Sequence, residues 1–294
     1  MRSTSAKHVS RSAGGTAAII IFLLLFGLIM ALPLLYTILQ SLKPLDELFI
    51  FPPRFFVRRP TLENFIQLKN ITSDLWVPFS RYLFNSVFLT VFCTAIQVVF
   101  ASMAAYPLAK HKFPGQKVFF NMVVLSLLFT NEVTFIPLYI MLSSMHLINS
   151  YMALILPVAA FPLGLYLMRQ NLLGFPDSVI ESARIDGANG RQTLFKVIIP
   201  NVMPSIATCT FLTLTNGFKL FDQNLALTGG MPSMLVEGGK INATELLALN
   251  IYSTYNIGKN YHGVAQAKAV IFFLLVAVLA IIQQKATSRK EVQQ

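Results

Sequence analysis

Ionisable side chains lie well inside two long apolar stretches of this sequence, where a charge is costly. Glu132 interrupts the stretch 118–142, and Lys219 and Asp222 interrupt the stretch 203–227. Ionisable groups placed inside hydrocarbon commonly serve an ion or substrate pathway, by proton transfer or by hydrogen bonding to a polar solute. A structural role is the alternative, in which Lys219 and Asp222 pair with each other and Glu132 joins two helices by a hydrogen bond.

Aromatic and amide side chains accompany the charges in the second of these stretches. In a continuous helix Phe218, Phe221 and Asp222 share one face, and Gln223 and Asn224 follow directly. An aromatic ring can stack on the C–H face of a sugar, and carboxylate and amide oxygens can accept hydrogen bonds from its hydroxyl groups. These five residues and the intramembrane glutamate named above are the candidate substrate path. The alternative is that the phenylalanines pack against lipid.

Sequence patterns for covalent or metal chemistry are missing. The four histidines lack paired metal-ligand spacing, and Cys93 and Cys209 both fall in apolar runs, which suggests neither a disulfide framework nor a thiolate metal site. No phosphate-binding GxxxxGK[ST] loop occurs, since Gly239-Lys240 is followed by Ile241. We therefore expect no catalytic residue, metal or cofactor on this chain. Any ATP and Mg²⁺ that it uses must be bound by partner subunits.

The elements that would position the candidate residues are membrane-spanning helices. Of the 294 residues 55% are hydrophobic and 12% are charged, whereas soluble domains carry about 25% charged residues. A helix needs about 20 mostly apolar residues to cross the hydrocarbon core of a bilayer. Six stretches meet this requirement and predict an all-α integral membrane protein, with one transmembrane domain over 16–284 and spans at 16–39, 83–109, 118–142, 152–168, 203–227 and 263–284.

Lysine and arginine in the connections predict the orientation of the spans. The first 15 residues, the connection 169–202 and the tail 285–294 are basic, whereas the loop near 146–150 has no lysine or arginine. By the positive-inside rule, both termini are cytoplasmic. The first outer loop, 40–82, carries six basic residues against four acidic ones, and the rule is weaker for longer loops. The formal charge of +11 suits basic loops against anionic membrane lipids, and no arginine-rich platform for nucleic acid stands out.

The most polar stretch of the second half is PDSVIESARIDGANGRQTLFKVIIP, residues 176–200, which we call the 176–200 loop. Pro176 suits the first turn of a short helix that ends near Asp186, and Gly187 supplies the left-handed turn behind it. Asn189 can cap a second short helix that leads to the next span. Neither helix is long enough to cross a bilayer. We expect the pair to form a compact cytoplasmic unit that lies on lipid or docks into another protein.

A spaced set of residues in this loop matches a known pattern. Glu-Ser-Ala is followed after three residues by glycine, and after nine more by Val-Ile-Ile-Pro. The loop thereby resembles the EAA loop of importer permeases of the ATP-binding-cassette (ABC) class, which reads EAA, three residues, Gly, nine residues, Ile, any residue, Leu-Pro. The positions that carry the resemblance, including an Asp-Gly-Ala centre, are Glu181, Ser182, Ala183, Asp186, Gly187, Ala188 and Pro200.

The resemblance implies a type I ABC importer permease fold with six spans and a cytoplasmic coupling helix. In that family the loop sits in a groove of the ATPase subunit, so Glu181 would be the polar contact to the ATPase and Gly187 would permit the turn. The implied partners are two ATPase copies, a second permease that is expected to be a different chain, and an extracytoplasmic sugar-binding protein. The implied location is the cytoplasmic membrane of a bacterial cell.

Two further stretches narrow the resemblance to carbohydrate-uptake permeases. SLKPLDELFIFPPRFFVRRPTLENF, residues 41–65, looks like their first outer loop, and LFDQNLALTGGMPS, residues 220–233, resembles their fifth-span exit with Met231 in place of a glycine. The resemblance covers nearly the whole chain. It implies a permease of the maltose-type, oligosaccharide-importing family, whose spans open alternately outward and inward.

Two other functions compete with this one. A proton-coupled secondary transporter could use Glu132 or Asp222 as a proton relay, but it leaves the pattern of the 176–200 loop unexplained. An intramembrane enzyme or a non-transporting scaffold is the second rival, and the missing metal and nucleophile patterns argue against the enzyme.

Overall fold

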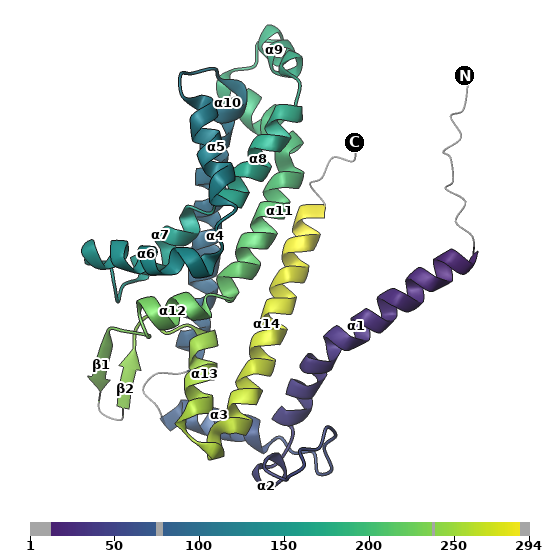
Figure 1. Ribbon diagram of the computed structural model, residues 1–294, viewed down its shortest axis with the longest axis vertical. Coiled ribbons are helices and arrows are strands. Elements are labelled where there is room, and N and C mark those ends of the chain that lie inside the picture. The colour runs from purple at the N-terminus through teal and green to yellow at the C-terminus, as the bar shows by residue number, and fades with distance from the viewer. Residues whose placement is uncertain (1–12, 75–78, 237–238, 289–294) are drawn as a thin grey trace.

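A computed structural model describes residues 13–74, 79–236 and 239–288, and most of this part is helical (Figure 1). In lipid, backbone polar groups must be satisfied within the protein, which favours helices. In chain order the elements are α1 (Ala13–Ser41), α2 (Leu45–Leu48), α3 (Glu63–Asp74), α4 (Phe79–Lys110), α5 (Gln116–Ser126), α6 (Asn131–Ser144), α7 (Tyr151–Ala159), α8 (Pro162–Gly174), α9 (Asp177–Ile185), α10 (Gly190–Gln192), η1 (Thr193–Ile198), α11 (Ile199–Phe218), α12 (Phe221–Leu227), β1 (Ser233–Val236), β2 (Gly239–Asn242), α13 (Leu247–Ile257), η2 (Lys259–Tyr261) and α14 (His262–Ser288).

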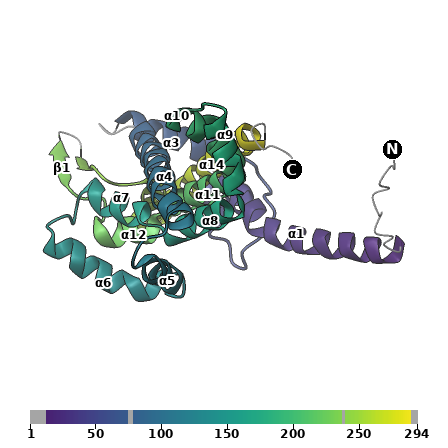
Figure 2. The same ribbon diagram turned by 90° about the horizontal axis from the view of Figure 1, so that it is seen from above.

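Five helical runs of the described chain are long and apolar enough to cross a membrane. They are Gly14–Ser41, Phe79–Lys110, Tyr151–Gly174, Gly190–Phe218 and Lys259–Ala286. Helices α4, α8, α11 and α14 pack side by side along the long axis, and α1 leans away from them (Figures 1 and 2). The side chains of α1 are exposed from Gly14 to Tyr36, so lipid or another subunit must cover this apolar helix.

The third predicted span, 118–142, is not one continuous helix. It is divided between α5 and α6, because the chain turns at 127–130 and Thr130 is extended (φ −77°, ψ 157°). Helix α6 runs across the direction of α4 in Figures 1 and 2. The average hydropathy of the stretch conceals the break, because both helices are mainly apolar although Asn131 and Glu132 directly follow Thr130. The remaining apolar helix is a short one, Val133–Ser144.

The fifth predicted span, 203–227, is also broken. Helix α11 ends at Phe218, and the chain re-forms a helix at Phe221. The cause is tertiary, since Leu220 turns inward to pack in a buried cluster with Leu89, Leu154 and other apolar residues. The single helical face expected for Phe218, Phe221 and Asp222 is therefore not formed, and that expectation was wrong.

A small hairpin, β1–β2, is an addition to the expected all-helical architecture. It is antiparallel, with Ser233 opposite Asn242. The Thr-Gly-Gly sequence before it supplies the turn: Gly229 and Gly230 have φ of 54° and 83°, and the Gly230 N–H donates to the Thr228 hydroxyl at 3.2 Å. The LTGG stretch noted in the sequence, residues 227–230, thus forms the turn that leads into this hairpin, and we call it the hairpin mount.

Three spans meet around one buried amide in the middle of the molecule. Gln97 of α4 is fully buried, and its Oε1 accepts hydrogen bonds from Cys209 Sγ and Thr213 Oγ1 of α11, each at 3.1 Å. Gly164 brings α8 against the same point, since a Cβ there would lie 2.0 Å from Gln97 Nε2 and 2.6 Å from Cys209 Sγ. Polar side chains and small residues are the usual means of joining helices in lipid.

This close approach makes a matched prediction within α8. Gly164→Ala should lower the melting temperature of the purified protein, because overpacking a filled core costs about 1–3 kcal/mol. Gly174→Ala lies in the same helix, where a new Cβ would meet nothing within 4 Å, and should leave the melting temperature unchanged or higher. Equal melting temperatures for the two variants would show that α8 does not depend on this contact.

Candidate coupling loop and substrate path

The first half of the 176–200 loop is a short helix closed by a glycine turn. Pro176 is extended (φ −65°, ψ 134°) and precedes α9, which ends before Asp186. Gly187 has φ of 82°, the left-handed region that glycine adopts without strain. Behind it the Ala188 N–H donates to the Ala183 carbonyl at 2.9 Å, which closes the helix end. The predicted left-handed turn at Gly187 is confirmed.

The second half of the loop begins with a capping box and runs directly into a span. Asn189 and Gln192 exchange side chain to backbone hydrogen bonds, each of 2.9 Å, which confirms the predicted cap. The chain then forms the π-helical turn η1 and enters α11 without interruption. Pro200 therefore lies within a continuous helical run. The wider turn before it accommodates a residue that has no N–H and whose ring would clash with a preceding carbonyl.

Buried contacts attach the loop to the spans on both sides. Ile180 of α9 and Ile198 of η1 belong to one apolar cluster with residues of α4, α8 and α11. At the end of α4, the buried Lys110 ammonium forms an ion pair of 2.6 Å with Asp177 and donates to the Phe175 carbonyl. A push on α9 must consequently reach three spans.

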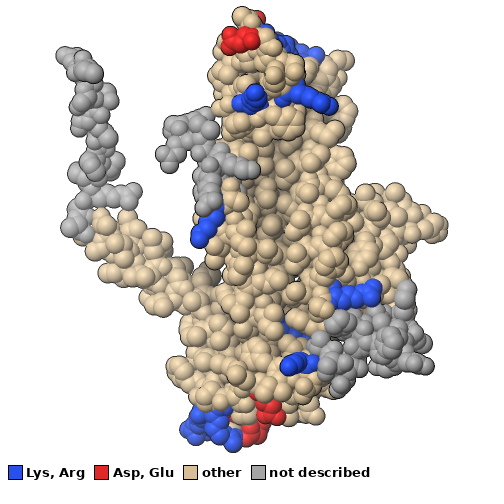
Figure 3. All heavy atoms as spheres, turned by 180° about the vertical axis from the view of Figure 1, so that it is seen from behind, with Lys and Arg blue, Asp and Glu red and all other residues tan. Residues whose placement is uncertain are grey.

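The opposite side of the loop faces away from the protein. Glu181, Ser182 and Asp186 are exposed, and Ala183 and Ala188 are half-buried. Two apolar side chains stand among the charges, since Ile185 is 81% exposed and Phe195 is 65% exposed. Figure 3 shows charged side chains gathered at this end of a largely uncharged body. A mixed charged and apolar surface at the end of the molecule is typical of a protein-docking site.

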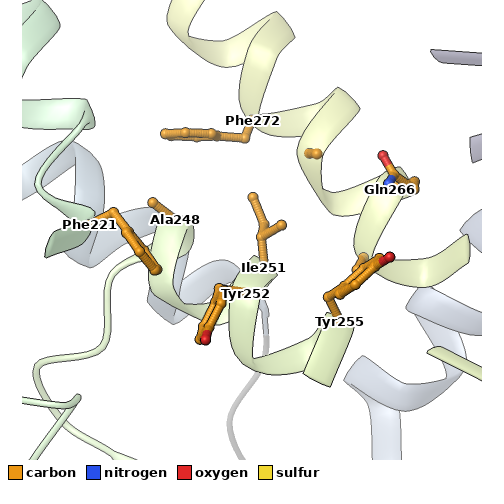
Figure 4. A pocket seen from close by; sticks show the side chains of 9 residues that line it. Phe221, Ala248, Ile251, Tyr252, Tyr255, Gln266 and Phe272 are labelled. Atoms are coloured by element: carbon orange, nitrogen blue, oxygen red, sulfur yellow. The ribbon is translucent and has the colours of Figure 1, made fainter. Parts of the chain in front are cut away.

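A separate aromatic hollow lies between α12, α13 and α14 (Figure 4). Its volume is about 340 Å³. Four of its nine lining residues are aromatic, and Gln266 offers an amide. The lining residues are Phe221, Ala248, Ile251, Tyr252, Tyr255, Ala265, Gln266, Ala269 and Phe272.

The structure separates the residues expected to form a substrate path. Phe221 lines the hollow, with its ring 5.1 Å from that of Tyr252, whereas Phe218 is buried behind it with its ring 6.0 Å from that of Phe272. Asp222 is exposed and forms no ion pair with the equally exposed Lys219.

The remaining polar candidates differ in what they can offer a ligand. Gln223 keeps a buried Oε1 without a hydrogen-bond partner among the described residues. Asn224 is fully buried and its amide is used internally: Nδ2 donates to the Thr228 hydroxyl and the Thr244 carbonyl, and Oδ1 accepts from the Leu246 N–H. Asn224 therefore holds the hairpin mount. The Glu132 side chain lies outside the described part of the structure; its backbone is in the first turn of α6.

Sequence reasoning missed most of the hollow. Tyr252, Tyr255, Gln266 and Phe272 come from α13 and α14, and none adjoins the charged residues that drew attention to the other candidates. A signal was present in the tyrosines at i and i+3, which share one face of a helix. Only the fold shows that this face lies opposite α14.

Comparisons with known proteins agree with this architecture. Residues 97–291 match the family described as binding-protein-dependent transport system inner membrane component. The arabinooligosaccharides transport system permease protein AraQ of Halalkalibacterium halodurans is 32% identical over 217 residues, which are 70% of this chain and 75% of that one. The polygalacturonan/rhamnogalacturonan transport system permease protein YtcP of Bacillus subtilis is 34% identical over 187 residues, which are 64% of this chain and 63% of that one.

A solved structure shares the fold. One chain of a bacterial ABC transporter involved in the import of the acidic polysaccharide alginate superposes with a TM-score of 0.73 at 21% identity, covering 95% of this chain and 99% of that one. The predicted ABC importer permease fold is therefore confirmed. With the family match over most of the chain, it follows that this protein belongs to the inner-membrane components of binding-protein-dependent transport systems.

Proposed function

We propose that this chain is a transmembrane permease subunit of an ABC-type sugar importer, with an oligosaccharide as its substrate. The observation that carries the proposal is the 176–200 loop, which is fixed to three spans on one side and presents Glu181 and Ile185 on the other. The sugar is supported by the relatives, whose names specify arabinooligosaccharides and polygalacturonan/rhamnogalacturonan.

Coupling follows from how the loop is attached. An ATPase that holds α9 and moves on binding ATP pulls on Ile180, on the Lys110–Asp177 ion pair and on the continuous helix that begins at Gly190. Because α4, α8 and α11 are joined around Gln97, they shift together and open the path alternately to the two sides. ATP and Mg²⁺ bind on the partner subunits, and this chain contributes no catalytic group.

The assembly contains two ATPase copies, a second permease of different sequence and an extracytoplasmic binding protein. The exposed face of α1 supports the second permease, because the side chains of this long apolar helix are exposed from Gly14 to Tyr36. Both termini and the 176–200 loop face the cytoplasm, as the basic residues of these segments indicate, and the loop that follows α1 then lies on the outer side.

The aromatic hollow is the best candidate for a sugar contact within this chain. Its rings can stack on sugar C–H groups, and the Gln266 amide can both donate to and accept from hydroxyl groups. Phe221 belongs to it, while Phe218 supports its wall. Gln223, Asp222 and Glu132 stay predictions as polar contacts along the path.

The proton-coupled alternative has less support. Asp222 is exposed and lies at the start of α12, with no ion-pair partner among the described side chains. A proton relay would also leave the shape of the 176–200 loop without a purpose.

The ATPase contact can be tested by reversing one charge. Glu181→Lys should abolish co-purification of the ATPase in mild detergent, because like charges brought together in an interface cost several kcal/mol. Glu63→Lys, an exposed carboxylate at the other end of the molecule, is the matched control and should retain the ATPase. Retention by both variants would contradict docking through α9.

The glycine turn can be tested within the same loop. Gly187→Ala places a Cβ in the left-handed region, at a cost of about 1–2 kcal/mol, and should reduce uptake and substrate-stimulated ATP hydrolysis while membrane insertion stays normal. Gly190→Ala adds a Cβ that meets nothing within 4 Å and needs no positive φ, so its uptake should match that of the wild type. Normal uptake by Gly187→Ala would remove the turn from the coupling mechanism.

The hollow predicts a kinetic effect. Tyr252→Ala should raise the KM for sugar uptake about three- to tenfold through the loss of ring stacking. Tyr139→Ala removes an exposed tyrosine of α6 that does not line the hollow, and it should leave KM unchanged.

Uptake should also survive a proton uncoupler and fail on ATP depletion, whereas the opposite pattern would favour the proton-coupled alternative.

A further inference from the structure

The segment from Leu42 to Thr61, which we call the Arg–Phe loop, leaves the end of α1 and returns to the same point. The Thr61 N–H donates to the Leu42 carbonyl at 2.9 Å and closes it. Inside the loop the buried Lys43 ammonium donates to the Arg54 carbonyl. The buried Glu47 carboxylate accepts from the Arg58 N–H at 2.8 Å. The loop therefore has a fixed shape that it holds from within.

The ionisation of Glu47 supports this rigidity. The hydrogen bond from the Arg58 N–H keeps the pKa of Glu47 below its usual value although the carboxylate is buried. A lowered carboxylate pKa means that the group is charged at neutral pH. Its contribution to the stability of the folded loop is lost only when the pH falls through the lowered pKa. The loop keeps its shape under ordinary conditions.

The Arg–Phe loop folds back along α1 toward the bilayer. The Phe55 ring lies 5.6 Å from the ring of Tyr36, which is more than one helical turn before α1 ends at Ser41. Phe56 contacts Phe55 with ring centroids 5.3 Å apart and is 73% exposed. Since α1 is an apolar span, side chains beside its last turns lie at the depth where acyl chains meet headgroups.

The same loop carries exposed rings and unpaired cations together. Phe51 is 92% exposed, the highest exposure of any large apolar side chain in the described residues. Arg59 pairs with Asp46. The exposed guanidinium groups of Arg54 and Arg58 form no ion pair with any described carboxylate. Figure 3 shows this cationic cluster at the end of the molecule opposite α9.

We propose that the Arg–Phe loop docks onto anionic phospholipid at the end of α1, with Phe51 and Phe56 in the interface and Arg54 and Arg58 on lipid phosphates. Guanidinium groups match phosphate geometry, and aromatic rings settle at headgroup level. The loop also touches the last span, because the Phe49 ring lies 5.3 Å from that of His262. Lipid docking would thus fix the depth of α1, a helix with few neighbours, relative to α14.

Insertion can be measured by fluorescence in the assembled transporter. In this chain the single tryptophan, Trp76, is replaced by phenylalanine, and Phe56→Trp is introduced. Reconstitution into vesicles of phosphatidylcholine and phosphatidylglycerol with brominated acyl chains should quench this tryptophan, most strongly when the bromine lies near the headgroup. Absence of quenching at any depth would overturn the proposal. A spectral shift caused only by adding the extracytoplasmic binding protein would do the same, because it would make the loop a protein-docking surface.

Headgroup recognition needs a separate measurement with a matched arginine. The assembly carrying both Arg54→Gln and Arg58→Gln should bind phosphatidylglycerol about tenfold more weakly in lipid titrations followed by native mass spectrometry, since each surface cation contributes to anionic lipid binding. Arg59→Gln removes a cation that is already paired with Asp46 and should have a smaller effect. Equal retention by the double variant and the wild type would overturn the role of the two arginines.

Discussion

The close contact of α4, α8 and α11 around Gln97 is the constraint on which the rest of this permease depends. In lipid, apolar side chains gain little from meeting one another, so helices are joined by small residues and buried hydrogen bonds. Gly164 lets α8 approach, and Cys209 and Thr213 bring α11 to the same amide. Because the 176–200 loop connects α8 to α11, a movement of the loop is useful only if these spans respond together. One buried glutamine gives them a common point.

The two ends of the molecule use different means for related purposes. At the α9 end, Ile180 and the Lys110–Asp177 pair hold a docking surface to the spans. At the other end, Asn64 Nδ2 donates to the Ser41 and Lys43 carbonyls at 2.8 Å, which ties the chain after α1 to α3. The polar groups that keep each end in shape face inward, and the groups left outward are those suited to a partner or to lipid.

Sequence reasoning succeeded where a local rule decides the structure. The turn at Gly187 and the cap at Asn189 depend on residues a few positions apart, so both could be predicted. The break at Leu220 could not, because it is set by packing against distant helices. The break at Thr130 has a local signal in the polar pair Asn131-Glu132 behind it, which the average hydropathy of the stretch conceals. Asn224 illustrates the same limit: next to Asp222 and Gln223 it reads as a ligand, yet it bonds to the Thr244 carbonyl and the Leu246 N–H, 20 and 22 residues away and beyond the hairpin. The tyrosines of the hollow needed the fold to reveal their neighbours.

The π-helical turn η1 sets the angular phase of α11. A π turn contains one residue more than an α turn and therefore rotates everything behind it by roughly 100° about the helix axis. Cys209 and Thr213 point at Gln97 only with this rotation included. The number of residues between Gly187 and Pro200 therefore determines which side of α11 faces Gln97. Adding or removing one residue would leave the side chains of α11 unchanged in type. It would rotate the helix about its axis, so that Cys209 and Thr213 no longer face Gln97.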